Sequence, residues 1–267
     1  MLNKLDLEKL RTQFAEASPF PYVMIDNFLV AEKAKEIADS YPRFDSAIGQ
    51  GKSFTTVNER KKVQVTNSSV FPAPVAELNK LLASPEFLHD LCYITNMPRL
   101  LADDELVGGG IHITGPGGRL DVHVDFNYIE ERKLHRRLNL LLYLNPTWQD
   151  QWGGHFQLWD KDVKNCKATF APTFNRCVIF ETSNISYHGV VPVSSEAGEP
   201  RKSFAAYYYT REAPANWTGV AHSTIFKARP EERYKRFLAM PAARIQDQLK
   251  AGSRKAKDAI KSLIGRS

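Results

Sequence analysis

Cysteine is scarce in this sequence, and long apolar runs are missing. The three cysteines, Cys92, Cys166 and Cys177, lie far apart and form no Cys-x-x-Cys pair. Such a set argues against a disulfide framework and is typical of reduced thiols in the cytoplasm. No apolar run reaches the roughly 18–20 residues of a membrane-spanning helix, and the charged N-terminus lacks the apolar core of a secretory signal. We therefore predict a cytoplasmic protein with no membrane span.

Positive charge is concentrated at the C-terminal end. The 267 residues have a formal net charge of +6, and residues 227–267 hold 12 Lys or Arg against 4 Asp or Glu. Basic tails can contact nucleic acid or anionic lipid. The solvated face of a helix is the more common use of such a pattern, and we favour it here. The oligomeric state is left open by the sequence.

The first hundred residues read mainly as helices. Apolar residues recur at helical spacing in four segments, at residues 3–17, 31–40, 72–82 and 85–94. Residues 22–29 predict a short strand. Residues 45–70 are polar with little periodicity, so we predict a long, mobile loop with one short strand. Long loops of this kind often cover a site, and residues 45–70 and 127–135 are the candidate lids.

From about residue 105 the chain becomes a series of short apolar runs between turn residues. Eight strands are predicted, at residues 105–114, 119–126, 136–145, 154–159, 166–170, 175–181, 186–193 and 201–210. This pattern predicts a mainly β fold, a double-stranded β-helix or jelly roll with helices packed outside, rather than βαβ units. Residues 1–267 would form a single domain, with a helical and extended support (1–100), a jelly-roll core (101–212) and a basic helical extension (213–267).

The strand predicted at 119–126 carries a pattern with chemical meaning. Residues two apart on a strand share a face, so His123 and Asp125 would lie side by side. The opposite face would carry Val122, Val124 and Phe126. An imidazole and a carboxylate so placed are two thirds of the 2-His-1-carboxylate set that binds Fe(II) with coordination positions left open. On its own, His-x-Asp is more often a solvated strand face, so the hypothesis requires a second histidine.

His188 is the candidate for that third ligand. It opens a predicted strand and follows His123 at a distance that accommodates four strands. A 2-oxo acid bound to iron would leave its distant carboxylate inside the barrel, where an unpaired charge is costly. Arg201 begins a later strand, and its planar fork suits a carboxylate. Ser203 shares the face of Arg201 and could add a second hydrogen bond.

Five motifs in this order resemble the iron(II)- and 2-oxoglutarate-dependent oxygenases of the prolyl 4-hydroxylase-like superfamily. They are HVD (123–125), RRLNLLLYLNPTW (136–148), WGGHFQLW (152–159), YHGV (187–190) and RKSFAAYYYT (201–210). The opening PFPYVMIDNFL (19–29) is similar to bacterial members.

The resemblance implies a role for each matched residue. His123, Asp125 and His188 would bind Fe(II), while Arg201 and Tyr143 would contact the C5 carboxylate of 2-oxoglutarate. It also implies hydroxylation of an unactivated C–H bond, with release of succinate and CO2 and with ascorbate as reductant. The substrate stays open between a peptidyl proline, another amino-acid side chain and a small metabolite.

One position departs from the family pattern. Many members have a tyrosine before the His-x-Asp strand, in a Tyr-Pro-Gly context, where this chain has Ile113-Thr114-Gly115-Pro116-Gly117. His112 or Thr114 could replace that tyrosine. A rival hypothesis is a non-catalytic jelly-roll binding module that acts through its basic tail, and the intact ligand set together with Arg201 argues against it.

Overall fold

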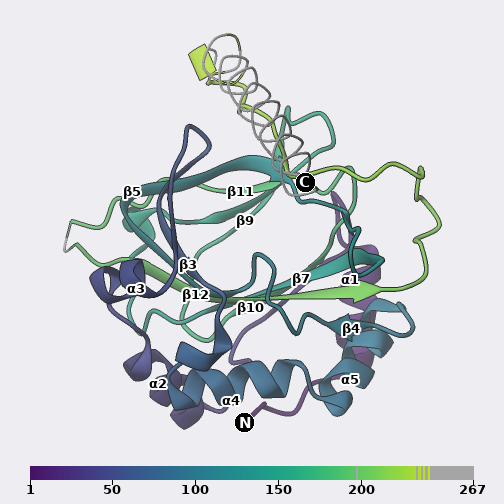
Figure 1. The fold of residues 1–267 in the computed structure, drawn as a ribbon, viewed down its shortest axis with the longest axis horizontal. Helices are drawn as coiled ribbons and strands as arrows, with labels where there is room; N and C mark the ends of the chain where they lie inside the picture. The colour runs from purple at the N-terminus through teal and green to yellow at the C-terminus, as the bar shows by residue number, and fades with distance from the viewer. Residues whose placement is uncertain (197, 233, 236, 238–239, 241–267) are drawn as a thin grey trace, which may run out of the picture.

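A single antiparallel sheet curls into two facing layers (Figure 1). The computed structural model describes residues 1–196, 198–232, 234–235, 237 and 240. One layer contains β1 (Tyr22–Ile25), β10 (Cys177–Glu181), β7 (Leu134–Tyr143) and β12 (Arg201–Thr210). The path continues through β5 (Gly110–Val124), β11 (His188–Val190), β8 (Phe156–Trp159) and β9 (Cys166–Phe170). The predicted mainly β, jelly-roll-like architecture is confirmed.

Strand β5 belongs to both layers and turns the corner between them. Its first half pairs with β12 and its second half with β11. Two separate strands were predicted here, and that prediction is wrong because Gly115-Pro116-Gly117-Gly118 bends the strand without ending it. Gly118 is required at the bend, since a Cβ there would lie 2.7 Å from the Gly115 carbonyl oxygen and 2.8 Å from that of Arg60. The bend places the metal-binding candidates opposite Arg201.

Helices cover the outer face of the β7–β12 layer (Figure 1). They are α1 (Leu7–Glu16), α2 (Ala31–Ser40), α4 (Ala73–Leu82) and α5 (Pro85–Thr95). Alternation along β7 turns Leu138, Leu140 and Leu142 toward these helices, where they join one apolar core with Leu78. The Tyr208 hydroxyl, at the same interface, donates a hydrogen bond to the Leu82 carbonyl oxygen.

Residues 45–70 are regular structure, so the prediction of a long loop is wrong. The segment contains α3 (Phe44–Gln50), β2 (Lys52–Thr55), β3 (Glu59–Val65) and the 3-10 turn η1 (Ser68–Val70). Strand β3 pairs with β5 along six residues, and its Val63 and Val65 are buried. Pairing with a neighbouring strand stabilises a Lys- and Arg-rich sequence whose own strand propensity is low. The β2–β3 hairpin is therefore built into the sheet.

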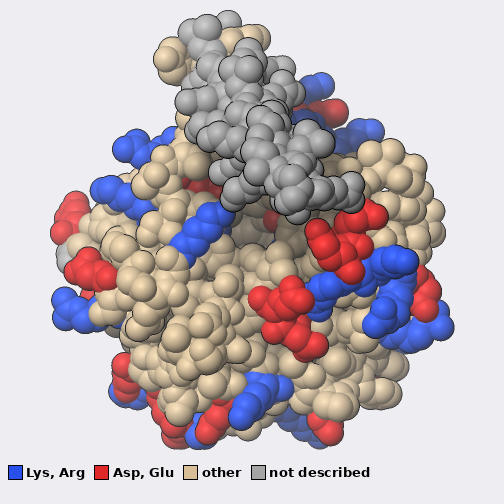
Figure 2. All heavy atoms as spheres, viewed as in Figure 1, with Lys and Arg blue, Asp and Glu red and all other residues tan. Residues whose placement is uncertain are grey.

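The remaining elements are short. They are β4 (Leu101–Ala102), β6 (Tyr128–Ile129), the 3-10 turn η2 (Asp150–Trp152) and β13 (Ile225–Phe226). Residues 213–229 contain no helix, and β13 pairs with β5. Most of the helical extension predicted at 213–267, with most of the basic tail, lies outside the described residues. On the face drawn in Figure 2, Lys and Arg side chains are interspersed with Asp and Glu side chains. Within the described part of the chain, no helix has the length and apolarity to cross a membrane.

Because the helical support and the sheet share one apolar core, we expect them to unfold together. Replacing the fully buried Leu78 by Ala should lower the free energy of unfolding by about 2–5 kcal/mol, because it leaves a cavity between α4 and the sheet. Chemical denaturation should show one transition at a lower denaturant concentration. The matched control is the exposed Lys80→Ala on the same helix, which should change stability by less than about 0.5 kcal/mol. Two separate transitions would contradict this description.

Candidate active site

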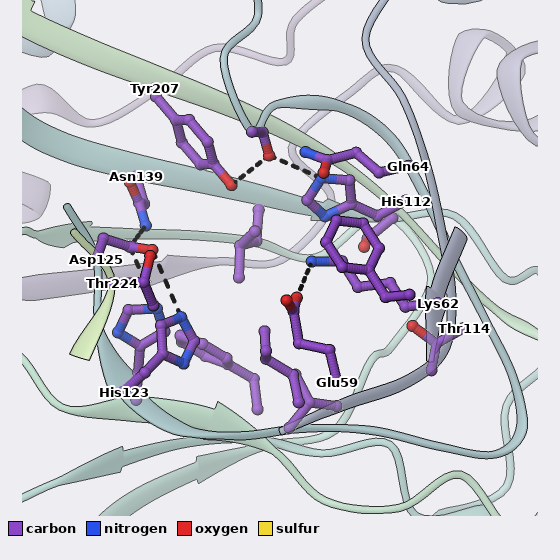
Figure 3. Close-up of a pocket in the computed structure, with 18 of the residues that line it drawn as sticks. Glu59, Lys62, Gln64, His112, Thr114, His123, Asp125, Asn139, Tyr207 and Thr224 are labelled. Carbon is purple, nitrogen blue, oxygen red and sulfur yellow. Dashed lines mark hydrogen bonds and ion pairs between the residues drawn. The ribbon is translucent and has the colours of Figure 1, made fainter. Parts of the chain in front are cut away.

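A cavity of about 200 Å³ lies between the two layers (Figure 3). The residues that line it come from both layers and from the segments that flank them. The hairpin provides Phe54, Glu59, Lys62 and Gln64; β5 and the residues just before and after it provide Gly108, His112, Thr114, Leu120, His123, Asp125 and Phe126; β8, β10 and β11 provide Phe156, Phe180, His188 and Val190; β7 and β12 provide Arg136, Asn139, Leu141, Arg201, Ser203 and Tyr207; and the C-terminal segment provides Thr224 and Phe226. The candidate metal ligands and Arg201 thus open into the same cavity.

Three candidate ligands converge at one wall of this cavity. His123 and His188 are direct neighbours across β5 and β11. The Nε2 atom of His123 lies 3.5 Å from Asp125 Oδ1, and that of His188 lies 3.4 Å from Asp125 Oδ2. One ligand atom from each residue falls within 4.8 Å of the other two. The structure brings together the three residues that the sequence singled out, in a geometry that could hold a metal ion.

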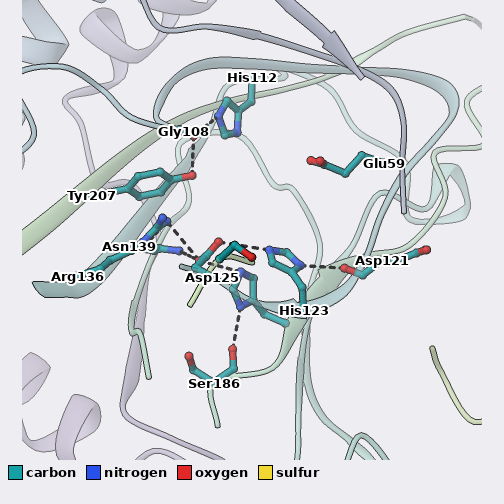
Figure 4. A network of polar contacts seen from close by, with 12 residues as sticks. Glu59, Gly108, His112, Asp121, His123, Asp125, Arg136, Asn139, Ser186 and Tyr207 are labelled. Carbon is teal, nitrogen blue, oxygen red and sulfur yellow. Dashed lines mark hydrogen bonds and ion pairs between the residues drawn. The ribbon is translucent and has the colours of Figure 1, made fainter. Parts of the chain in front are cut away.

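One backbone carbonyl determines the tautomer of each imidazole (Figure 4). The Nδ1 atom of His123 lies 2.8 Å from the Asp121 carbonyl oxygen, and that of His188 lies 2.9 Å from the Ser186 carbonyl oxygen. A carbonyl only accepts hydrogen bonds, so Nδ1 carries the proton in each neutral ring and Nε2 keeps its lone pair. Burial, followed by the charge of His123, lowers the pKa of His188 to about 3. His188 is therefore neutral at physiological pH and its Nε2 is available to a metal.

Arg136 and Asn139 hold the Asp125 carboxylate. Asp125 Oδ2 accepts a hydrogen bond from Asn139 Nδ2 at 2.8 Å and lies 3.2 Å from Arg136 Nη2. Arg136 in turn donates two hydrogen bonds to Asn139 Oδ1 and stacks 3.7 Å from the ring centre of Tyr207. Burial would raise the pKa of Asp125, but Arg136 and then the two histidines hold it well below its usual value. Since His188 is neutral, Arg136 supplies the decisive charge.

Sequence reasoning missed Arg136 because strand alternation fails at that point. On β12, Tyr208 pairs with Leu138 and the next residue, Tyr209, pairs with Arg136. This bulge adds one residue to β7 and turns Arg136 to the same side as Asn139. A strictly alternating strand would have put Arg136 with Leu138, on the helix-covered face. The paired arginines of RRLN were the only signal in the sequence, and pairing partners were needed to interpret it.

Arg201 is anchored at the wall formed by β12. Its Nε donates to the Gly154 carbonyl oxygen at 2.8 Å, and its Nη1 donates to Ser203 Oγ at 3.3 Å. Gly154 has a φ of +67°, and a Cβ there would lie 3.1 Å from Arg201 Cδ, so only glycine permits this close approach. The guanidinium carbon lies 4.9 Å from the ring centre of Tyr143. Arg201 and Ser203 lie together, as the strand geometry predicts.

Tyr143 is fully buried beside Arg201, but it does not line the cavity. Among the described residues its hydroxyl has no hydrogen-bond partner. Burial raises the pKa of this hydroxyl to about 12, although Arg201 opposes the rise. A buried donor without an acceptor, next to a buried guanidinium, suits a carboxylate that would accept from both.

The strand register indicates which residue could take the place of the missing family tyrosine. Thr114 on β5 is paired directly with Arg201, and His112 is paired with Ser203. The Nε2 atom of His112 already lies 3.0 Å from the Gly108 carbonyl oxygen. The Thr114 side chain is buried at the cavity wall. Thr114 is therefore the better placed of the two candidates.

Other predicted positions are used differently. Phe126 lines the cavity instead of sharing the face of Val124, because β5 ends at Val124. The rings of Trp148 and Trp152 pack edge to face with centres 5.4 Å apart, and neither lines the cavity. Asn127, in a candidate lid, bonds to the C-terminal segment.

Comparison with known proteins agrees with this geometry. Residues 109–209 match the 2OG-Fe(II) oxygenase superfamily. The matched residues are less than half of the chain, and they include His123, Asp125, His188 and Arg201. Prolyl 3-hydroxylase OGFOD1 of Mus musculus is 36% identical over 78 residues, which are 28% of this chain. That match spans 14% of the length of the mouse protein.

Solved structures share the fold of this chain. A prolyl-4-hydroxylase of Pseudomonas putida superposes with a TM-score of 0.52 at 18% identity, over 75% of this chain and 98% of that one. A prolyl hydroxylase of Trichoplax adhaerens, solved with a peptide fragment of hypoxia inducible factor, gives 0.53 at 17% identity, over 76% and 90%. At these identities the likeness concerns the fold alone.

Removing the guanidinium beside Asp125 should expose its electrostatic role. Arg136→Met should lower the free energy of unfolding of the metal-free protein by about 3–5 kcal/mol, because the buried carboxylate loses its compensating charge. Denaturation with a chelator present measures this loss, and Mn(II) should stabilise the variant more than the wild type. The neighbouring Arg137→Met, which loses one hydrogen bond to Thr210, should cost about 1 kcal/mol. Equal stability of the two variants would refute the role given to Arg136.

Proposed function

We propose that this protein is an Fe(II)- and 2-oxoglutarate-dependent dioxygenase that hydroxylates an unactivated C–H bond. The observation that supports this most directly is the convergence of His123, Asp125 and His188, with both Nε2 lone pairs directed at one point beside the carboxylate. Two imidazoles and one carboxylate on one side of an ion are the ligand set of non-haem Fe(II) oxygenases, and they leave positions open for cosubstrate and oxygen.

The chain would divide the work between two walls of the cavity. His123, Asp125 and His188 would hold the metal, while Arg201, Ser203 and Tyr143 would pair with the far carboxylate of 2-oxoglutarate. Leu120, Leu141 and Val190 line the same cavity and would keep water from it. Bound Fe(II) with 2-oxoglutarate supplies the oxidising power, and the cosubstrate leaves as succinate and CO2. The protein supplies orientation and dryness.

An amino-acid side chain, such as that of a peptidyl proline, is the substrate we propose. The cavity of about 200 Å³ would have little space left once a cosubstrate is bound, which favours one side chain over a large metabolite. The hairpin puts Phe54 at this cavity with the ammonium groups of Lys52 and Lys62 within 5.0 Å of the ring centre. We infer that the hairpin contacts the substrate. The mouse relative is named as a prolyl 3-hydroxylase, which supports this class.

We also propose a cellular compartment and a reductant for this protein. The three cysteines are free thiols, as a reducing cytoplasm would keep them. Ascorbate would serve as reductant in the reaction mixture, to return oxidised iron to Fe(II).

Loss of either ligand of the His-x-Asp pair should abolish turnover. His123→Ala and Asp125→Ala should each reduce succinate release, measured with Fe(II), 2-oxoglutarate, ascorbate and a pool of proline-containing peptides, to the level of the no-enzyme blank. The control is His89→Ala, an exposed histidine of α5, which should keep wild-type turnover. Wild-type turnover in either ligand variant would refute the proposed function.

Arg201 should act on the cosubstrate specifically. Arg201→Met should raise the KM for 2-oxoglutarate about 10- to 100-fold, the expected cost of a lost charge-assisted hydrogen bond. The matched control is Lys202→Met, the adjacent residue of β12, which does not line the cavity. An unchanged KM in Arg201→Met would show that the carboxylate binds elsewhere.

A further inference from the structure

The C-terminal segment lines the cavity with Thr224 and Phe226, and it lies outside the matched residues 109–209. Asn127 anchors its beginning, since its side chain donates to the Val220 carbonyl oxygen at 3.1 Å and accepts from the His222 backbone N–H at 2.9 Å. Strand β13 then pairs with β5, and the Lys227 backbone N–H donates to the Val122 carbonyl oxygen at 2.8 Å. Backbone hydrogen bonds thus attach this segment to the strand that carries the metal-binding candidates.

Two side chains of the segment reach the candidate metal centre. Phe226 is paired with His123, and their ring centres are 5.3 Å apart with an interplanar angle of 34°. Thr224, two residues earlier and on the same face, lies beside Asp125 and His123 (Figure 3). Ile225 points the other way and is 38% exposed. The imidazole of His123 therefore lies between Phe226 on one side and His188, 4.3 Å away between ring centres, on the other.

Asp121 joins this segment to His123. Its carboxylate is completely buried, and Oδ1 lies 2.9 Å from Lys235 Nζ, 3.2 Å from Arg119 Nε and 3.8 Å from Arg229 Nη1. Lys235 and Arg229 both follow β13. The backbone carbonyl of the same Asp121 accepts the hydrogen bond from His123 Nδ1. One residue therefore orients a candidate ligand through its backbone and holds the C-terminal segment through its side chain.

We propose that residues 222–232, together with Lys235, are a functional part of the metal centre. In this inference, which rests on the proposed function, Phe226 is a positioning residue that holds the His123 ring at the angle needed for metal binding. Asp121 is the latch that keeps the segment in place through Lys235 and Arg229.

Phe226 is needed because a single hydrogen bond does not immobilise the His123 ring. The Nδ1–H bond to Asp121 fixes the position of one ring atom but leaves the imidazole free to swing about that atom. Packing against Phe226 removes that freedom. Outer partners that orient a metal-binding histidine typically contribute 10- to 100-fold to metal affinity.

Mn(II) binding without cosubstrate tests the role of Phe226. The free ion is measured by electron paramagnetic resonance while the full-length protein is titrated. Phe226→Ala should weaken the Kd for Mn(II) about 10-fold, and Phe226→Leu, which keeps most of the packing, should restore part of it. The matched control Ile225→Ala, on the opposite face of β13, should stay within about twofold of the wild type.

Hydrogen–deuterium exchange tests the latch. Asp121→Asn and the milder Lys235→Gln should both speed exchange of the amides of residues 222–229 and weaken Mn(II) binding. Asp26→Asn, which breaks the distant ion pair with Arg176, should do neither. Lys235→Gln leaves β5 untouched, so the test remains valid if Asp121→Asn does not fold.

The Mn(II) titration and the exchange experiment together decide whether the C-terminal segment supports the metal centre. Weaker Mn(II) binding in Phe226→Ala and faster exchange in Lys235→Gln would support the proposal. Faster exchange with unchanged Mn(II) affinity, or equal losses in Phe226→Ala and Ile225→Ala, would overturn it. A wild-type protein that binds no Mn(II) would instead refute the proposed function itself.

Discussion

A buried carboxylate has to be compensated, and this requirement organises the site. Asp125 lies between His123 and the neutral His188, and the buried cation that balances its charge in the metal-free protein is Arg136. Arg136 is itself buried, and it is held by Asn139 and by the ring of Tyr207. Desolvating a charge pair costs free energy that is recovered only with good geometry. Arg136, Asn139 and Tyr207 therefore keep the Asp125 carboxylate ionised and able to bind a metal ion.

Arg201 poses the same problem with a positive charge, since a buried guanidinium also needs a compensating partner. Arg201 is buried against Gly154 and Ser203, and the hydroxyl of Tyr143 beside it has no partner in the described part of the chain. One wall thus offers the Asp125 carboxylate and two imidazole nitrogens to a metal ion. The other wall offers hydrogen-bond donors, those of Arg201 and Tyr143, with no carboxylate among the described residues to accept from them. A molecule that coordinates a metal at one end and carries a carboxylate at the other would satisfy both walls.

Segments outside the matched residues 109–209 complete the cavity. The β2–β3 hairpin precedes the matched residues 109–209, and residues 222–229 follow them, yet both pair with β5. Because β5 carries His123 and bends between the two layers, it is the strand on which the hairpin, the core and the C-terminal segment meet. The core would supply the chemistry, whereas the flanking pieces shape what can reach it.

The sequence predicted the elements that have strong local patterns. The strands at 166–170 and 201–210 appear with the predicted bounds, and the jelly-roll-like architecture is confirmed. The failures arise where tertiary contacts override local pattern. Pairing with β5 makes a strand of the Lys-rich hairpin, glycines bend β5 where a break was expected, and a bulge turns Arg136 inward.

The candidate site divides in the same way. The sequence motifs were enough to single out His123, Asp125, His188 and Arg201, and all four line one cavity. Their roles in binding a metal and a cosubstrate stay predictions. Asn139, Asp121 and Phe226 could not be identified, because their importance depends on strand register and on ion pairs between distant segments.

A crystal structure of the protein with Mn(II) and 2-oxoglutarate, grown without oxygen, tests the central claim most directly. The account predicts one anomalous manganese peak coordinated by His123 Nε2, His188 Nε2 and one oxygen of Asp125, with the far carboxylate of 2-oxoglutarate on Arg201. Manganese bound elsewhere, no ordered manganese, or a carboxylate held by Lys62 instead of Arg201 would contradict it.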